Sequence, residues 1–437
     1  MRLLNCHTLR FQEFLGNEIP RYLILSHRWG ADEVDYKDFR KGRGQGTDGY
    51  RKILEFCRFA RTRLPPGLHE GAVGRPCDWV WIDTCCIDKR SSAELSEAIN
   101  SMYAWYQRAQ ECIVYMADVP SFDAGFQAGH AAFCASSWFA RGWTLQELVA
   151  PHDVLFCNKT WGIVGHKCIQ GSCKHDLMRF GLTVTDCVAG LTGIHPFVLK
   201  NPNLVRQLTI AERMSWAARR TTTRIEDQAY CLFGLLGVNL PLLYGEGQRA
   251  FRRLQEELLR RTTDHSLLTS GSWSGPYLRG LLVDSPSWYQ TCGNTIHFAG
   301  DTPMSIVEQN RGFELQCTPF LTLELVRFGT LHVILLNCHT RPTELHSNTP
   351  IFDHISCSPD CVKCAEIRSI HYQRDVLILQ KQPPPRDLYS KDVYLRWNPQ
   401  TLQDPKKFTI KSSSHNHTEM TFLVPRDDPL PLIAFPE

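Results

Sequence analysis

Short apolar runs alternate with helical stripes between Tyr22 and Cys157, and this alternation constrains the fold more than any other feature of the chain. A parallel strand pair needs a crossover connection, which is usually a helix, so strands and helices that alternate indicate a parallel sheet. The pattern therefore predicts an α/β fold, a flavodoxin-like parallel sheet with helices on both faces. The expected strands are Tyr22–Ser26, Val80–Asp83, Cys112–Tyr115 and Val154–Cys157, the first two adjacent, and the first expected helices are Tyr50–Leu64 and one capped by Ser91 or Ser92.

In the rest of the chain, the pattern of apolar residues changes twice. From Thr209 to Arg261 the pattern is helical and ends in a stripe with Phe251, Leu254, Leu258 and Leu259 facing inward. Beyond Leu267, short apolar runs are separated by Pro, Gly and Asn, which is typical of strands. We therefore expect three parts: an α/β domain in residues 1–165, a helical extension in 166–266 and a β-rich domain in 267–437.

Composition excludes several classes of protein. A formal charge of +3 over 437 residues gives no field that would attract nucleic acid. No apolar run reaches the roughly 18 residues of a membrane span, and no signal peptide precedes the 18 scattered cysteines. We expect a soluble protein of the cytoplasm with reduced thiols.

The segment Ser137–Leu148 carries two tryptophans, an arginine and a lone carboxylate around an expected helix start. Trp143 and Glu147 are four residues apart and share one helical face. Such a pair, with Arg141 nearby, could stack a flat ring, stabilise a developing cation and bind a phosphate. The alternative is a core helix in which Trp143 is buried and Glu147 is solvated at the edge.

Polar side chains follow the first two strands. Ser26, His27, Arg28 and Trp29 lie at the end of the first, and Asp83 at the end of the second. In open α/β sheets this edge carries the ligand site. Cys85 and Cys86, beside Asp83, are interpreted as buried thiols rather than nucleophiles, because a nucleophile would need a base and a lowered pKa.

Three segments, in order, resemble the signatures of the fungal heterokaryon incompatibility (HET) domain family. They are Leu25–Gly30 (LSHRWG), Trp81–Asp88 (WIDTCCID) and Arg141–Leu148 (RGWTLQEL). The resemblance runs from about Tyr22 to Trp161 and continues more weakly to Gly247. The HET family is in turn similar to the Toll/interleukin-receptor (TIR) domain, some members of which cleave NAD with the glutamate of a W-x-x-x-E pattern.

This resemblance implies an incompatibility effector that triggers regulated cell death, with NAD as substrate and no required cofactor. Carried over to this sequence, it makes Glu147 the catalytic carboxylate and places substrate against a set of binding residues: Ser26, His27, Arg28, Trp29, Asp83, Arg141 and Trp143. The alternative is a non-enzymatic module that signals by association. In both cases the implied partner is a second copy of the chain or another incompatibility or NLR-type protein.

Other motifs support weaker hypotheses. The segment Gly44–Gly49 matches G-x-G-x-x-G, but the charged residues before it cannot form the buried strand of a dinucleotide fold, so a loop is expected, and no P-loop motif occurs. The thiols of Cys357, Cys361 and Cys364 have spacing compatible with structural zinc, or with unliganded thiols in a loop. The same spacing resembles the radical-SAM signature, whose barrel would not fit in the remaining chain. A looser set, Cys168, Cys173 and His175, is read as a surface loop.

Overall fold

The computed structural model describes residues 1–63, 75–121, 126–167, 184–262, 264–268 and 282–293, and beyond these the backbone of a series of strands. The chain divides into two compact units. The first comprises residues 1–207 and 219–247, and the second comprises residues 208–218 and 248–437. The predicted division at residues 165 and 266 stays a prediction.

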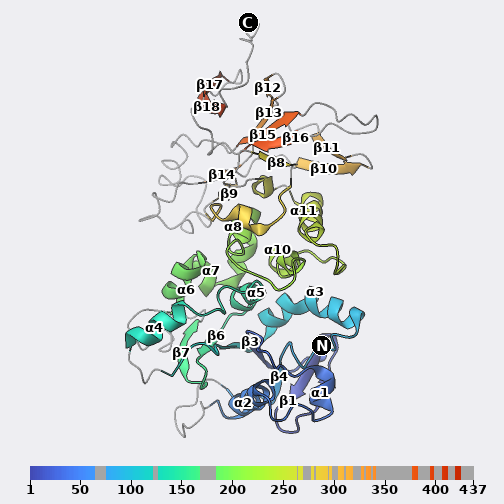
Figure 1. The fold of residues 1–437 in the computed structure, drawn as a ribbon, viewed down its shortest axis with the longest axis vertical. Coiled ribbons are helices and arrows are strands. Elements are labelled where there is room, and N and C mark those ends of the chain that lie inside the picture. Colours follow the sequence, from blue (N-terminus) through green and yellow to red (C-terminus); the bar gives the residue numbers. More distant parts are fainter. Residues whose placement is uncertain are drawn as a thin grey trace. The chain divides into compact units, whose positions relative to one another are not determined.

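A seven-stranded mixed sheet forms the centre of the first unit, in the order β2-β1-β4-β3-β5-β6-β7 (Figure 1). The four inner strands are parallel, and the order β4-β3-β5-β6 is that of a flavodoxin-like sheet. This confirms the α/β prediction and the pairing of the first two predicted strands. The bounds are β1 Arg2–Asn5, β2 Phe11–Glu13, β3 Leu23–His27, β4 Trp79–Trp81, β5 Glu111–Tyr115, β6 Val154–Cys157 and β7 Ile163–Lys167.

Beyond the predicted parallel strands, the sheet continues at both edges with antiparallel strands. The hairpin β1-β2 pairs with β4 in the antiparallel direction, and β7 returns antiparallel to β6. The pairs β1-β2 and β6-β7 share one physical reason: a short connection can only reverse the chain beside the previous strand. In the order β4-β3-β5, the strand that follows β3 in the chain lies on one side of β3, and the strand after that lies on the other side. This reversal of strand order makes a topological switch point beside β3.

Helices cover both faces of this sheet, with α2 (Asp48–Thr62) below it and α3 (Ser92–Arg108) above it in Figure 1. The predicted caps are confirmed in position: Ser91 accepts a hydrogen bond from the amide of Glu94 and begins α3. On the sheet, the buried Trp81 packs edge-on against Tyr106 of α3. The loop over Gly44–Gly49 leads into α2, which Thr47 caps, and the charged stretch before it forms α1 (Tyr36–Arg40), so the dinucleotide-binding alternative is excluded.

A close backbone approach fixes the segment before α5 (Thr144–Val149). Arg141 and Thr221 form an isolated parallel bridge, and the amide of Gly142 donates to the carbonyl of Thr221 over 2.8 Å. A Cβ at position 142 would lie 2.5 Å from the Thr222 side chain. Glycine is therefore required in the Arg-Gly-Trp sequence because another chain segment crosses there.

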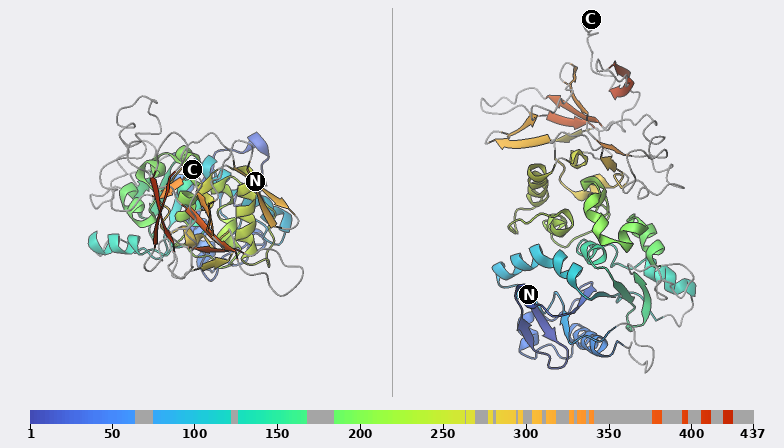
Figure 2. Two further views of the ribbon diagram at one scale, coloured as in Figure 1. Left: turned by 90° about the horizontal axis from the view of Figure 1, so that it is seen from above. Right: turned by 180° about the vertical axis from the view of Figure 1, so that it is seen from behind.

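The other helices of the first unit are short. They are α4 Phe126–Cys134, α6 Val184–Thr192, α7 Pro196–Lys200, α9 Asp227–Tyr230 and α10 Phe233–Leu236, with 3₁₀ turns η1 Gly16–Glu18 and η3 Pro202–Gln207. The view from behind in Figure 2 shows α4 beside the strands β6 and β7. Phe133 of α4 packs edge-on against Phe156 of β6.

The second unit contains α8 (Ile210–Ser215) and α11 (Arg249–Arg261), with 3₁₀ turns η4 His265–Leu268 and η5 Pro286–Tyr289. The inward residues predicted for α11 are buried, and the buried Gln255 hydrogen-bonds both backbone groups of Val283. The β-rich prediction beyond residue 267 agrees with the strands that follow. They are β8 Tyr277–Arg279, β9 Thr295–His297, β10 Met304–Gln309, β11 Gly312–Cys317, β12 Val326–Phe328, β13 Leu331–Leu335, β14 Cys338–Thr340, β15 Val376–Lys381, β16 Tyr394–Trp397, β17 Lys406–Lys411 and β18 Glu419–Val424.

Candidate functional site

The carboxyl end of β3 carries a buried relay of three side chains. The Trp138 indole donates a hydrogen bond to Oγ of Ser26 over 2.8 Å, and the Ser26 hydroxyl donates to Oε2 of Glu147 over 2.5 Å. A hydroxyl has a single proton to donate, and here that proton goes to the carboxyl group. The relay therefore has one direction, from Trp138 through Ser26 to Glu147.

Glu147 lies on α5 and is only 5% exposed. Burial raises the pKa of its carboxyl group to about 8, and the negative charge of Asp83 adds to this rise. The hydrogen bond from Ser26 and the charge of Arg141 act in the opposite direction. At neutral pH the carboxyl is therefore mostly protonated, and a cation bound beside it would favour its ionised form.

His27, the last residue of β3, faces two carboxylates. Its Nε2 lies 3.7 Å from Oε1 of Glu33 and 3.9 Å from Oδ1 of Asp83, which is too long for a hydrogen bond in either case. Burial lowers the pKa of the imidazole, and the charge of Lys52, which binds Glu33, lowers it further. The ring is 3% exposed and neutral.

Several buried polar atoms around His27 have no hydrogen-bond partner in the described part of the chain. They are Nδ1 and Nε2 of His27, Oε2 of Glu33 and Oδ1 of Asp83. Buried polar groups are nearly always paired, so a cluster of unpaired ones is typical of a place where water or a ligand binds. This cluster lies at the switch point of the sheet, where open α/β folds bind their ligands.

An aromatic ring and two cations lie next to this cluster. The Trp29 indole donates to Oδ2 of Asp83 over 2.8 Å and remains 40% exposed. The Nζ atom of Lys89 lies 3.5 Å from the centre of the Trp29 ring, and the guanidinium carbon of Arg141 lies 5.2 Å from it. An exposed indole flanked by two cations suits a ligand that combines a flat ring with phosphates.

Comparison with known proteins gives the family. Residues 22–131 match the model described as Heterokaryon incompatibility protein (HET). Residues 22–131 of this chain therefore carry a HET domain. Residues 249–299 match a second model, Domain of unknown function (DUF8212).

One curated relative is the Vegetative incompatibility protein HET-E-1 of Podospora anserina. It is 42% identical over 289 residues, which cover 62% of this chain and 19% of that protein. The matched part therefore spans about a fifth of the length of this relative. No solved structure matches the chain. Among the helices in the described ranges, none is both long and apolar enough to cross a membrane.

The first unit brings most of the predicted site residues together and separates two of them. Ser26, His27, Trp29, Asp83, Arg141 and Glu147 form a continuous set of contacts and charges. Arg28 is exposed. The Trp143 indole interacts instead with Asp227, whose pKa it lowers while burial, the larger effect, raises that pKa. Trp143 is the N-cap residue of α5 and has helical backbone angles.

Sequence reasoning missed four contributors to the site: Trp138, Lys89, Lys52 and the Glu33 contact with His27. Trp138 lies in the segment Ser137–Leu148 and Lys89 directly follows the motif Trp81–Asp88, so these segments could have indicated both residues. Lys52 carries no such signal, because it comes from the middle of α2.

The thiols beside Asp83 behave as predicted. Cys85 and Cys86 are buried, and burial raises the pKa of Cys85. Cys86 accepts a hydrogen bond from the amide of Ile82, which is a structural role. The predicted zinc ligands Cys357, Cys361 and Cys364, and the loop cysteines Cys168 and Cys173, lie outside the described residues.

Proposed function

We propose that this HET-domain chain acts in heterokaryon incompatibility and promotes regulated cell death. The family match over residues 22–131 and the 42% identity to a vegetative incompatibility protein support this role. The polar and titratable side chains at the ends of β3 and β4 are the candidates for catalysis or ligand binding in this role. We also propose that the protein acts in the cytoplasm.

We further propose that the site cleaves the glycosidic bond of NAD, as some TIR domains do. The observation that carries the proposal is the contact between Ser26 and Glu147 beside the unpaired atoms of His27 and Asp83. A carboxyl group with a strongly raised pKa at a sheet switch point is a typical catalytic acid or base. The four-strand order supports the TIR analogy at the level of the fold.

The chemistry uses the positive charge of the nicotinamide ring. Bound next to Glu147, this cation would draw the carboxyl into its ionised form, which then stabilises the oxocarbenium-like ribose as neutral nicotinamide leaves with the bonding electron pair. Water attacks the C1′ atom of the ribose and loses a proton, which gives ADP-ribose. Lys89 and Arg141 are the candidates to bind the pyrophosphate.

One observation favours the second candidate, a non-enzymatic module that signals by self-association. The Glu147 side chain is 5% exposed and capped by Ser26, so this conformation offers substrate little access to the carboxyl. Under the enzyme proposal, assembly of several copies opens the site.

The test measures nicotinamide and ADP-ribose released from NAD by the purified chain, dilute and under crowding. Release that appears with assembly supports the enzyme. Assembly and cell death without either product support the signalling module.

A further inference from the structure

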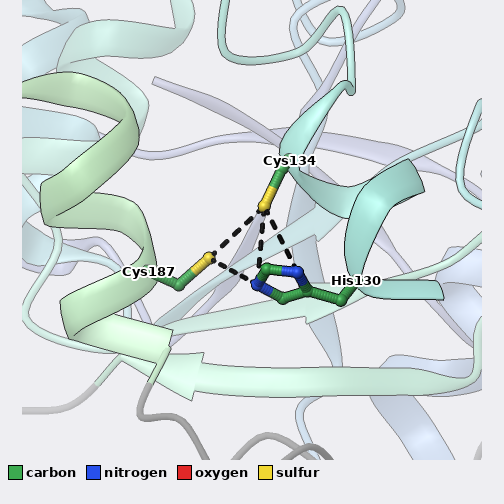
Figure 3. A group of neighbouring side chains, drawn as sticks. All are labelled: His130, Cys134 and Cys187. Atoms are coloured by element: carbon green, nitrogen blue, oxygen red, sulfur yellow. Dashed lines mark hydrogen bonds between the residues drawn. The ribbon is translucent and has the colours of Figure 1, made fainter. Parts of the chain in front are cut away.

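A second cluster of reactive side chains lies on α4 and α6, apart from the Glu147 site. His130 and Cys134 are four residues apart on α4 and so lie on one face, and Cys187 comes from α6 (Figure 3). Their ligand atoms all lie within 4.8 Å of one another. All three side chains are half-buried, so an ion could reach them from solvent.

The spacing of these atoms matches the edges of a metal tetrahedron. The two Sγ atoms are 3.7 Å apart, and each lies 3.6 Å from Nε2 of His130. A tetrahedral zinc ion with Zn–S near 2.3 Å and Zn–N near 2.0 Å has S–S edges of about 3.8 Å and S–N edges of about 3.5 Å. One ion can therefore bind all three atoms once the His130 ring turns to aim Nε2 at it, because Sγ of Cys134 lies almost as close to Nδ1, at 3.9 Å, as to Nε2.

We propose that Cys134, Cys187 and Nε2 of His130 bind a zinc ion. Thiolate and imidazole ligands favour zinc over magnesium or calcium, which prefer oxygen. A disulfide is the competing use of the two cysteines, but their Sγ atoms are far beyond the roughly 2.05 Å of a bond and the thiols are free. Three ligands leave the fourth position of the ion to water or another donor.

A zinc ion at this site would link α4 to α6, two helices that are far apart in the sequence. Phe133, next to Cys134, is fully buried against Phe139 and Phe156. The segment directly after α4 carries Trp138 and leads to Glu147. Zinc would therefore stabilise the element from which the catalytic segment starts.

Differential alkylation of the wild-type full chain tests the proposal without relying on a variant. Among the cysteines whose burial the structure describes, Cys134 and Cys187 alone are not buried, so they should be alkylated first among these when the protein is free of metal and reduced. Added zinc should slow both together by roughly tenfold or more, as read by peptide mass spectrometry, because a metal-bound thiolate is a poor nucleophile. Unchanged rates, or a slowing of one cysteine alone, would overturn the site.

Cobalt substitution gives an independent check. The wild type should show the visible bands of tetrahedral cobalt, and these should be lost in Cys187→Ser and in His130→Ala. They should remain in Cys361→Ser, which removes a thiol of the predicted cluster Cys357, Cys361 and Cys364. Bands that persist in Cys187→Ser but vanish in Cys361→Ser would assign the metal to that predicted cluster and contradict this site. A Cys134–Cys187 disulfide in the isolated wild type, reversed by reductant and unaffected by zinc, would also contradict it.

Discussion

The hydroxyl of Ser26 donates a hydrogen bond of 2.5 Å to the carboxyl group of Glu147 across 121 residues of sequence. The contact joins the end of β3 to α5. It also places a carboxyl with a raised pKa beside the unpaired polar atoms of the sheet edge.

Replacing Ser26 by alanine should break the relay. The Trp138 indole would lose its acceptor in the core, which costs about 1 to 3 kcal/mol of unfolding free energy. The pKa of Glu147 should rise further, because the bond from Ser26 lowers it. Denaturant unfolding and a ¹³C carboxyl titration measure the two effects. Trp138→Phe is the control: it should leave the Glu147 pKa closer to the wild-type value than Ser26→Ala does.

Replacing Asp83 by asparagine should lower the pKa of Glu147 below about 8, because the charge of Asp83 helps to raise it. Asparagine keeps an oxygen to accept the Trp29 indole. If Glu147 acts in its ionised form, kcat/KM for NAD should rise with pH through this pKa, and the rise should move to lower pH in the variant. Asp78→Asn, which removes an exposed carboxylate paired with His7, should leave the profile unchanged. A profile that does not move in Asp83→Asn would remove Glu147 as the titrating group.

Glu147→Gln should stabilise the fold above neutral pH. The folded pKa of about 8 exceeds the unfolded value of 4.5, so the native state holds the proton more tightly and loses stability as pH rises between these values. Each pH unit in that window corresponds to about 1.4 kcal/mol of unfolding free energy. The unfolding free energy of Glu147→Gln should therefore exceed that of the wild type by on the order of 1 to 3 kcal/mol near pH 7. Unfolding curves at pH 5 and pH 8 check this. A variant that is less stable than wild type at pH 8 would contradict the raised pKa.

The packing of α10 on α3 depends on Gly234. A Cβ there would lie 2.1 Å from Cβ of Tyr103, so Gly234→Ala should destabilise the first unit by about 1 to 3 kcal/mol. Gly190 on α6 has no atom within 4 Å of such a Cβ, and Gly190→Ala should be neutral or stabilising. Relative to the wild type, the melting temperature should fall in Gly234→Ala and should stay the same or rise in Gly190→Ala. Equal melting temperatures of the two variants would refute this packing.

The inner strands could be predicted from sequence because β3, β5 and β6 are buried along nearly their whole length and read as apolar runs. The edge hairpin β1-β2 could not, because Arg2–Asn5 and Phe11–Glu13 are short and half polar. The ends of the predicted strands indicated where a site would lie, but the contacts within the site could not be predicted.

The bond between Ser26 and Glu147 depends on the packing of α5 on the sheet. The position of Trp143 near Asp227 depends on residues far away in sequence. The pairing of α4 with α6 at Cys134 and Cys187 is likewise a tertiary contact without a local signal.

The central claim is that Glu147 provides the charge that stabilises NAD cleavage. Glu147→Gln keeps the shape of the side chain and can still accept from Ser26, but it cannot ionise. The exposed Glu97 on α3 supplies the matched control, Glu97→Gln.

The direct measurement is nicotinamide and ADP-ribose release by assembled wild type, Glu147→Gln and Glu97→Gln at equal folded fraction. We expect wild type and Glu97→Gln to cleave NAD equally, and Glu147→Gln to be slower by roughly 10² to 10³, which corresponds to about 3 to 4 kcal/mol of transition-state stabilisation. Equal cleavage by wild type and Glu147→Gln, or no cleavage by assembled wild type that still induces cell death, would contradict the claim.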